Sequence, residues 1–256
     1  MIASPWETAP SCPGVACNTW LYRLCNTPRR GELESGDWLL RRWEAVRPLD
    51  GERVAVVRDR LDPGRLGVRK RAVEPSEIGS LDRERDHLAE LSHPAFRRVL
   101  GSGRTGAGEA VTVLEYVEGA PLDAHLAAVP SEALRCAEEL LRALVHLHER
   151  GRAHGDLKPL NVLVQGGGRL RLIDLGLTAP LGAPPVGGTP SFLSPELARG
   201  EPLSVGSDLF AFGETLRAAL GDRGPPASER LVELLARCSS PRAADRPASA
   251  AAALAH

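Results

Sequence analysis

The stretch "HGDLKPLN", residues 154–161, carries an aspartate, a lysine and an asparagine close together, at Asp156, Lys158 and Asn161. Two short apolar runs follow, "NVLV" and "RLRLID", and the "QGGG" between them predicts a β-hairpin. The second run ends at Asp174, in "IDLG". Because the two ends of a hairpin lie side by side, we expect these four polar side chains to converge.

The sequence changes character on the two sides of residue 118. Before it, apolar-rich runs at 52–57, 65–73 and 109–117 favour strands. One helix is predicted over 80–94, where Leu81, Leu88 and Leu91 share a face. A strand-rich part followed by a helix-rich part predicts two lobes with a cleft between them.

The part that follows is mostly helical. Helices are predicted over 131–151, 207–220, 229–238 and 248–255. Ser131 stands where it can cap the first of these, and Gly151 suits a left-handed exit from it. We expect a domain over 37–256, with lobes of about 37–114 and 118–256, and a partly disordered N-terminal extension over 1–36.

Composition excludes several classes of protein. A formal net charge of −1 gives no basic excess for a nucleic-acid partner. We interpret the arginine pairs as solvated surface, with a phosphate-binding patch as the alternative. No apolar run is long enough for a membrane span, and the N-terminus has no secretion signal. We therefore expect a soluble, cytoplasmic protein without a membrane partner; the oligomeric state stays open.

Five cysteines fit a reducing compartment. Cys136 and Cys238 fall in helical patterns and are expected in the core. Cys12, Cys17 and Cys25 lack zinc-finger spacing and a nearby histidine, so an inert tail is favoured over a zinc site.

"HGDLKPLN" with "IDLG" resembles the catalytic loop and the magnesium loop of the protein kinase family, in particular the eukaryotic-like serine/threonine kinases of bacterial type. The resemblance extends to "GTPSFLSPE" (188–196), which is similar to the substrate-facing loop, and to "LEYVEG" (114–119), which is similar to the hinge between lobes. Asp208 matches the family's aspartate that supports the catalytic loop, and Arg246 matches the arginine that pairs with a glutamate, here Glu196. The implied fold is α+β and bilobal, with the active site in the cleft.

The resemblance also implies roles for single residues. Asp156, Lys158, Asn161 and Thr189 would be catalytic, with Asp156 orienting the substrate hydroxyl and Lys158 neutralising the γ-phosphoryl group. Thr189 would hydrogen-bond Asp156 and Lys158. Residues that would bind ATP are Lys70, Glu84, Glu115, Val117, Leu163 and Asp174, with Lys70 on the α and β phosphates and backbone groups of Glu115 and Val117 on adenine. Asn161 and Asp174 would hold Mg²⁺.

Lysine occurs only twice in the chain, at Lys70 and Lys158; every other Lys or Arg position holds arginine. The two side chains are interchangeable on a solvated surface, but lysine presents a compact point charge beside phosphates and metal. Both lysines fall on the family's lysine positions. We interpret them as retained for ATP chemistry, with a coincidence in a small sample as the alternative.

The sequence departs from the family pattern at several positions. The glycine-rich loop should lie in 44–57, but Gly51 is the only glycine there. Gly155 replaces an arginine that pairs with a phosphorylated activation loop, and Leu175 replaces a phenylalanine. Leu160 stands where kinases of basic substrates carry glutamate. His154 is expected to pack in the core, in a spine with Leu88 and Leu175 anchored at Asp208.

Three functions compete at this point. We favour an active serine/threonine protein kinase that uses ATP and Mg²⁺ and phosphorylates a protein with a Ser or Thr acceptor. A pseudokinase, acting as an ATP-binding or scaffold module, is the alternative because of the missing glycines. A small-molecule phosphotransferase is disfavoured by "GTPSFLSPE" with Asp208 and Arg246, since these shape a peptide-binding surface.

Overall fold

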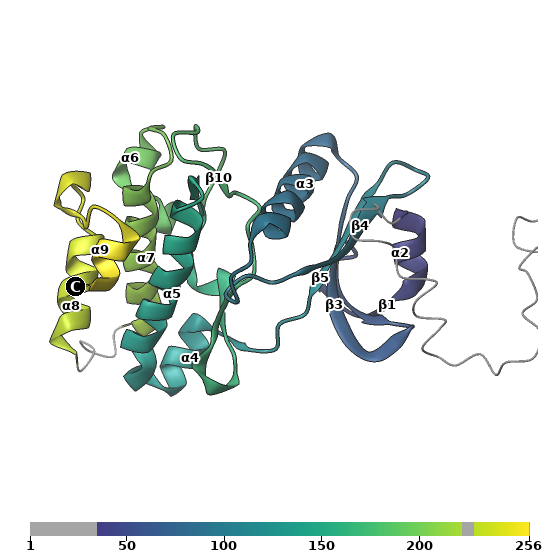
Figure 1. Cartoon of the computed structure of the whole chain (residues 1–256), viewed down its shortest axis with the longest axis horizontal. Coiled ribbons are helices and arrows are strands. Elements are labelled where there is room, and N and C mark those ends of the chain that lie inside the picture. Colours follow the sequence, from purple (N-terminus) through teal and green to yellow (C-terminus); the bar gives the residue numbers. More distant parts are fainter. Residues whose placement is uncertain (1–34, 222–227, 256) are drawn as a thin grey trace, which may run out of the picture.

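The computed structural model describes residues 35–221 and 228–255 and has two lobes (Figure 1). The predicted extension falls almost entirely on residues 1–34, outside the described residues, as do Cys12, Cys17 and Cys25. The α+β bilobal architecture expected from the sequence is confirmed.

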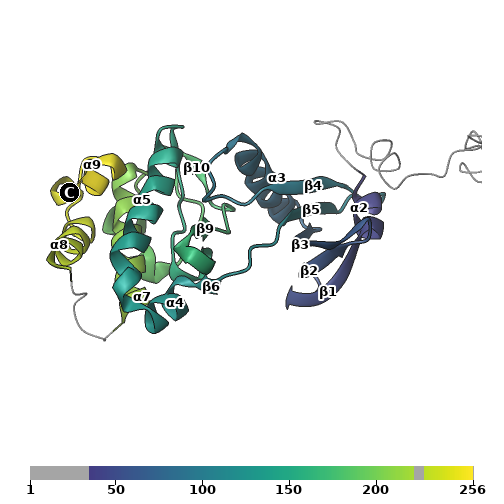
Figure 2. The same cartoon turned by 60° about the horizontal axis from the view of Figure 1, so that its bottom comes forward.

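The N-terminal lobe is an antiparallel five-stranded sheet with one helix on each face (Figures 1 and 2). The strands, in spatial order, are β1 (Trp43–Asp50), β2 (Val54–Asp59), β3 (Asp62–Ala72), β5 (Ala110–Glu115) and β4 (Val99–Arg104). Helix α3 (Pro75–Glu90) lies on the face toward the C-terminal lobe, and α2 (Gly36–Arg42) lies on the other. Alternation along β5 explains this, because Val111 and Val113 pack with Leu39 of α2 while Ala110 packs with Leu81 of α3.

The C-terminal lobe is built around α5 (Ala133–His148) and α7 (Val205–Leu220). Its other helices are α4 (Leu122–Ala128), α6 (Pro195–Ala198), α8 (Glu229–Cys238) and α9 (Ala250–Ala255). This lobe also has two small β-sheets. One is formed by β6 (Ala120–Pro121), β8 (Val162–Val164) and β9 (Leu170–Leu172). The other is the pair of β7 (Arg152–Ala153) and β10 (Ala179–Pro180). The predicted hairpin is thus the pair β8–β9.

Helix α5 forms because apolar residues recur every three or four positions, and eight of its residues are buried. The chain leaves it through Gly151, whose φ of 67° is left-handed as predicted. The predicted cap at Ser131 is wrong: Ser131 belongs to a 3₁₀ turn, Pro130–Glu132, and Glu132 precedes the helix without a side-chain cap. Cys136 and Cys238 are fully buried, as expected for core residues.

A buried carboxylate supports the loop that holds "HGDLKPLN". Asp208, in the first turn of α7, accepts hydrogen bonds from the backbone N–H of His154 at 2.7 Å and of Gly155 at 3.1 Å, and pairs with His148 Nε2 at 2.9 Å. Burial alone would raise the pKa of the Asp208 carboxyl, but the His148 contact and the His154 backbone bond together hold this pKa below its ordinary value.

Gly155 has a structural reason for being glycine. Its φ is 80°, and a Cβ at this position would lie 2.7 Å from the carbonyl oxygen of Leu177. An arginine here would require both a strained backbone and a displaced Leu177. Glycine stands here in place of the family's arginine because the loop after β9 passes too close to residue 155 for a side chain.

His154 is almost completely buried beside Asp208, as expected of a packing residue. Its Nδ1 accepts a hydrogen bond from the backbone N–H of Asp156 at 3.3 Å, which requires an unprotonated Nδ1. Burial lowers the pKa of the His154 imidazole, against the opposing charge of Asp208. The ring is therefore neutral in the folded protein.

A second buried ion pair joins the substrate-facing loop to the C-terminal end of the domain. Arg246 donates two hydrogen bonds to Glu196, one of them 2.9 Å long, and further bonds to backbone carbonyls at Ser240 and Gly206. The Arg246 side chain is fully buried. The pairing of Glu196 with Arg246 was expected from the sequence, and the structure contains it.

Removal of this arginine tests its contribution to stability. Arg246→Met leaves the Glu196 carboxylate buried without its partner, and we expect unfolding to require about 3–5 kcal/mol less. Urea denaturation of the full chain measures the loss. The matched control is Arg242→Met, because Arg242 is 83% exposed in its ion pair with Asp245; it should change stability by less than about 0.5 kcal/mol. If both variants lowered the free energy of unfolding equally, the buried Arg246–Glu196 pair would not have the stabilising role described.

The neutral His154 ring gives a pH dependence of known sign. Its pKa is lower in the folded than in the unfolded chain, so the unfolded chain takes up protons first as pH falls below about 6.5. Stability should be full above that pH and decline below it. The pKa values of His87, His93 and His146 are also lowered by burial and act in the same direction.

Urea unfolding at pH 7.0, 6.0 and 5.0 checks this. A His154→Asn variant cannot titrate, so its stability should fall less steeply between pH 6 and 5, by up to about 1.4 kcal/mol per pH unit. Identical pH slopes for wild type and variant would show that His154 is not held neutral by the fold.

Candidate active site

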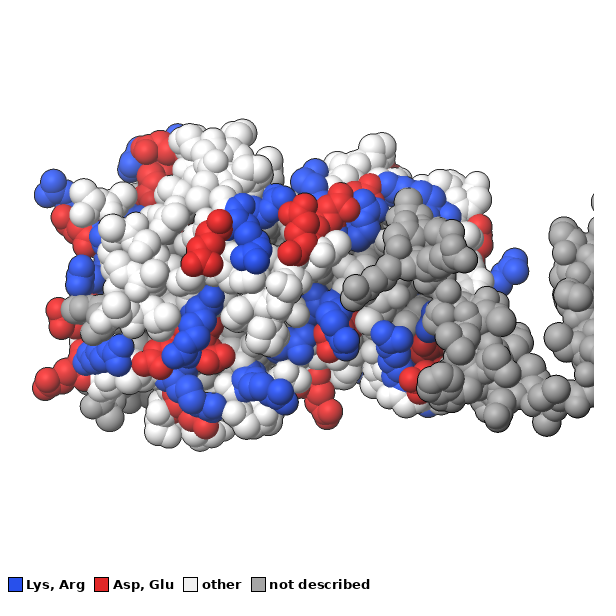
Figure 3. Space-filling model, viewed as in Figure 1, with Lys and Arg blue, Asp and Glu red and all other residues white. Residues whose placement is uncertain are grey.

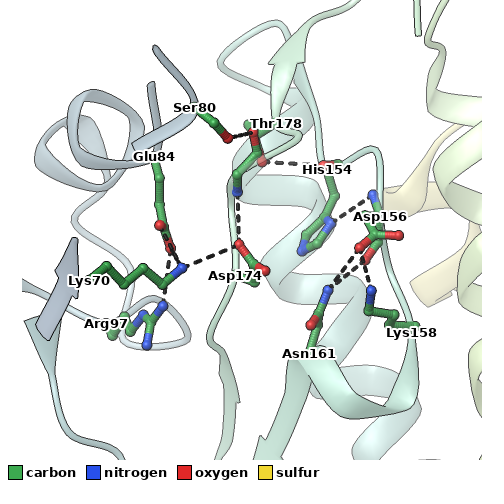
Figure 4. A network of polar contacts seen from close by, with 11 residues as sticks. Lys70, Ser80, Glu84, Arg97, His154, Asp156, Lys158, Asn161, Asp174 and Thr178 are labelled. Atoms are coloured by element: carbon green, nitrogen blue, oxygen red, sulfur yellow. Dashed lines mark hydrogen bonds and ion pairs between the residues drawn. The ribbon is translucent and has the colours of Figure 1, made fainter. Parts of the chain in front are cut away.

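The catalytic-loop residues expected from the sequence meet in one cluster (Figure 4). Lys158 Nζ lies 2.7 Å from Asp156 Oδ2 and 2.9 Å from Thr189 Oγ1. The Thr189 hydroxyl and backbone N–H both donate to Asp156 Oδ1, at 2.8 and 2.9 Å. Asn161 Nδ2 donates to the backbone carbonyl of Asp156 at 2.9 Å. Both carboxylate oxygens of Asp156 are therefore held in place.

Local structure sets these positions. Pro159 begins a single 3₁₀ turn, Pro159–Asn161, which directs Asn161 back toward Asp156 before β8 begins. Thr189 precedes another such turn, Pro190–Phe192, in the segment that leads to α6. The cluster thus joins the loop before β8 to a segment about 30 residues further along the chain.

A second cluster lies beside it, formed by Lys70 and Glu84 of the N-terminal lobe with Asp174 of the C-terminal lobe. Lys70 lies in β3 opposite Thr112, and β-strand alternation turns its side chain to the face that α3 covers. Lys70 Nζ bonds both oxygens of Glu84 in α3, at 2.9 and 2.7 Å, and lies 3.7 Å from Asp174 Oδ1 (Figure 4). Burial would raise the pKa of Asp174, but the Lys70 charge and the Gly176 N–H keep it lowered. Asp174 is therefore ionised at neutral pH.

Two adjoining cavities lie between the clusters, with volumes of about 520 and 470 Å³. Both are lined by Lys70, Val54 and Asp174. Val117, Leu163 and Asn161 line the larger one, and Glu84 and Asp156 line the smaller one. Seven of the sequence-predicted residues thus line these two cavities, which share part of their walls.

Glu115, Lys158 and Thr189 do not belong to the walls of these two cavities. The Glu115 backbone N–H donates to the carbonyl of Arg98 at 2.8 Å, and the side chain is held by Arg171 at 2.8 Å. A ligand could use only the backbone carbonyl of Glu115.

The roof of the larger cavity is the β1–β2 hairpin, which differs from a glycine-rich loop. Its strands remain paired as far as Asp50 and Val54, and Gly51 takes the tight turn with φ 51°. Arg47 and Leu49 line the cavity from β1. The missing glycines noted in the sequence are thus replaced by a closed β-ribbon with side chains over the cavity.

The donor set suits a hard cation that keeps water or phosphate ligands. No cluster of three or more His, Cys, Asp or Glu side chains able to hold a metal occurs within 35–221 and 228–255. Asp174 offers carboxylate oxygens, and Asn161 uses its amide nitrogen for Asp156, which leaves the amide oxygen for a ligand. Mg²⁺ is bound in this way, by one or two protein oxygens together with phosphate and water.

Sequence patterns did not indicate several contacts that hold α3 in place. Ser80 Oγ of α3 donates to the carbonyl of Gly176 at 3.2 Å, and His87 Nε2 bonds the carbonyl of Thr178 at 2.8 Å. Arg97 adds a bond to Glu84 from the segment before β4. These residues carry no periodic or motif signal, because each partner is a backbone group or lies on an element remote in sequence.

Charge over the rest of the surface is mixed. Figure 3 shows basic and acidic side chains interspersed on the visible face. Of the arginine pairs, Arg41 and Arg42 precede β1, whereas Arg97 is buried and Arg98 is exposed. In the described ranges, no helix has both the length and the hydropathy required to cross a bilayer.

Comparisons with known proteins agree with this geometry. The protein kinase domain model matches residues 67–254. The chain is 32% identical over 190 residues to a probable serine/threonine-protein kinase of Streptomyces coelicolor, covering 68% of this chain and 27% of that protein. It is 30% identical over 227 residues to the serine/threonine-protein kinase PknA of Mycobacterium tuberculosis, covering 79% and 51%. The matched region is thus about a quarter to a half of these relatives' length.

A solved structure supports the fold independently of sequence. The kinase PK-1 of the Cydia pomonella granulovirus superposes with a TM-score of 0.69 at 19% identity, covering 86% of this chain and 96% of that one. Since a family model matches most of the chain and the fold is shared, the chain belongs to the protein kinase family.

Proposed function

We propose that the chain is an ATP-dependent serine/threonine protein kinase. The observation that carries this is the placement of two clusters beside the same cavities, Asp156 with Lys158, Asn161 and Thr189, and Lys70 with Glu84 and Asp174. Phosphoryl transfer depends on positioning and charge neutralisation, and these two clusters supply both. The names of the bacterial relatives support the same activity.

The larger cavity would hold the nucleotide. Val117 and Leu163, which line it, would supply apolar surface for the base, and the backbone of Val117 would bind the polar edge of the base. The family resemblance assigns a further hydrogen bond to the carbonyl of Glu115, just outside the wall. Lys70, fixed by Glu84, would hold the α and β phosphates. Asp174 and Asn161 would hold Mg²⁺, which supplies positive charge at the phosphates when bound.

The smaller cavity leads to the transfer site. Asp156 would accept a hydrogen bond from the acceptor hydroxyl and take its proton. Lys158 would neutralise charge on the transferred group. The Thr189 hydroxyl holds both side chains at 2.8–2.9 Å and would align them with a serine or threonine of a protein substrate. Leu160 is 63% exposed in this loop and offers no charge for a basic substrate. A cytoplasmic location stays a prediction from composition, as does the lack of nucleic-acid and membrane partners.

A phosphotransfer assay tests the proposal. The full chain with γ-labelled ATP and Mg²⁺ should phosphorylate casein or itself on serine or threonine. Asp156→Asn should lower the rate by at least about 10²-fold, because proton transfer is lost. Lys70→Met should lower it comparably. Arg217→Met, at an exposed position in α7, is the matched control and should retain the wild-type rate.

The same preparation distinguishes the pseudokinase. If wild type and both variants transfer equally little phosphate while ATP still raises the melting temperature, the chain binds ATP without catalysis. Absence of any nucleotide-dependent stabilisation would overturn the ATP-based function altogether.

A further inference from the structure

Arg97 is a buried cation in the wall of the larger cavity, and it has no role among those proposed so far. It lies between α3 and β4, and only 6% of it is exposed. It lines the cavity together with Lys70, Asn161 and Asp174. Arginine is almost never this buried without partners, so its bonds need an explanation.

The bonds of Arg97 leave most of its donors unused. Nη2 donates to Glu84 Oε1 at 3.1 Å, and the same oxygen accepts from Lys70 Nζ at 2.9 Å (Figure 4). Two cations therefore share one carboxylate. Arg97 Nε is buried and has no hydrogen-bond partner among the described residues. An arginine has five N–H donors, and one in a cavity wall with a single hydrogen bond to the described residues can donate from its terminal nitrogens to a ligand.

The β1–β2 hairpin above the cavity explains why an additional cationic side chain would be needed there. Its strands are paired up to the turn, apart from two register shifts, and Gly51 is the only glycine that would let its backbone approach an anion closely. Pro48 lacks an N–H altogether. Side chains must then supply the positive charge that backbone amides would otherwise provide at the phosphates.

We propose that Arg97 is a phosphate-binding residue for the nucleoside triphosphate, acting beside Lys70 from a shared anchor on Glu84. The guanidinium would keep Nη2 on Glu84 and direct its remaining donors at phosphate oxygens, for which its planar fork is suited. This inference rests on the proposed function, because it requires that the cavity binds a nucleotide.

Calorimetric titration of the full chain with ATP, ADP and adenosine, in the presence of Mg²⁺, tests the inference. Arg97→Met should weaken ATP binding about tenfold or more and adenosine binding less than twofold, because only phosphate contacts are lost. Arg60→Met is the matched control, since Arg60 lies in the turn between β2 and β3 and its side chain is 61% exposed; it should leave all three affinities unchanged. If Arg97→Met does not fold, Arg97→Lys should weaken ATP binding partly and spare adenosine.

A double-mutant cycle separates direct contact from an effect through Glu84. If Arg97 contacts phosphate, Arg97→Met should weaken ATP binding further in a Glu84→Gln background. If Arg97 only holds Glu84, it should cause no further loss there, and the inference is overturned. Equal weakening of ATP and adenosine would also overturn it. If the wild type and Arg97→Met bind ATP equally well, only this inference fails. If the wild type binds neither ATP nor adenosine, the proposed function fails as well.

Discussion

The geometry of the site depends on one buried carboxylate, that of Asp208. A charge at this depth is tolerated only when it is fully hydrogen-bonded, and Asp208 meets this condition by binding the backbone of His154 and Gly155 and the ring of His148. Its place in the first turn of α7 adds the positive end of the helix dipole. Because the loop backbone is fixed there, Asp156 follows in a set position.

The second constraint is the position of α3 between the lobes. Glu84 is held by Lys70 from β3 and by Arg97 from the segment before β4. Ser80 and His87 bind backbone carbonyls of the segment after Asp174. Since these contacts come from both lobes, the helix joins Lys70 to the loop that carries Asp174. The two halves of the site are thereby aligned by one element.

The β1–β2 hairpin departs from the family's glycine-rich loop while the fold is kept. It places Arg47 and Leu49 over the cavity. The cations that line the cavity are Arg47, Lys70 and Arg97, and only Lys70 stands at a position that the family motif explains. Three cations here would attract a polyanion without backbone donors from the hairpin, because charge acts over longer distances than a single backbone hydrogen bond.

Most of the architecture could be predicted from the sequence, because strong amphipathic periods and motif spacing are local signals. Helices α5, α7, α8 and α9 and the β8–β9 hairpin were expected. Strand β1 could not be predicted, because all its residues but the first are exposed and its sequence therefore lacks the alternation of apolar and polar residues that marks a strand. Helices α2 and α4 are only seven residues long, and β4 contains two glycines, so neither the helical nor the strand period is visible. Helix α3 begins five residues earlier than predicted, at Pro75.

By itself, the sequence determined which chemical groups are available: two lysines among many arginines, the acids at Asp156 and Asp174, and the amide at Asn161. Spacing along the chain also indicated that Asp156, Asn161 and Asp174 lie next to the two ends of one hairpin. Only the tertiary structure decided which groups meet, as Arg97 with Glu84 and Leu177 with Gly155 demonstrate. The physical reason is that a contact between elements depends on how they pack, and packing leaves no periodic trace in either segment.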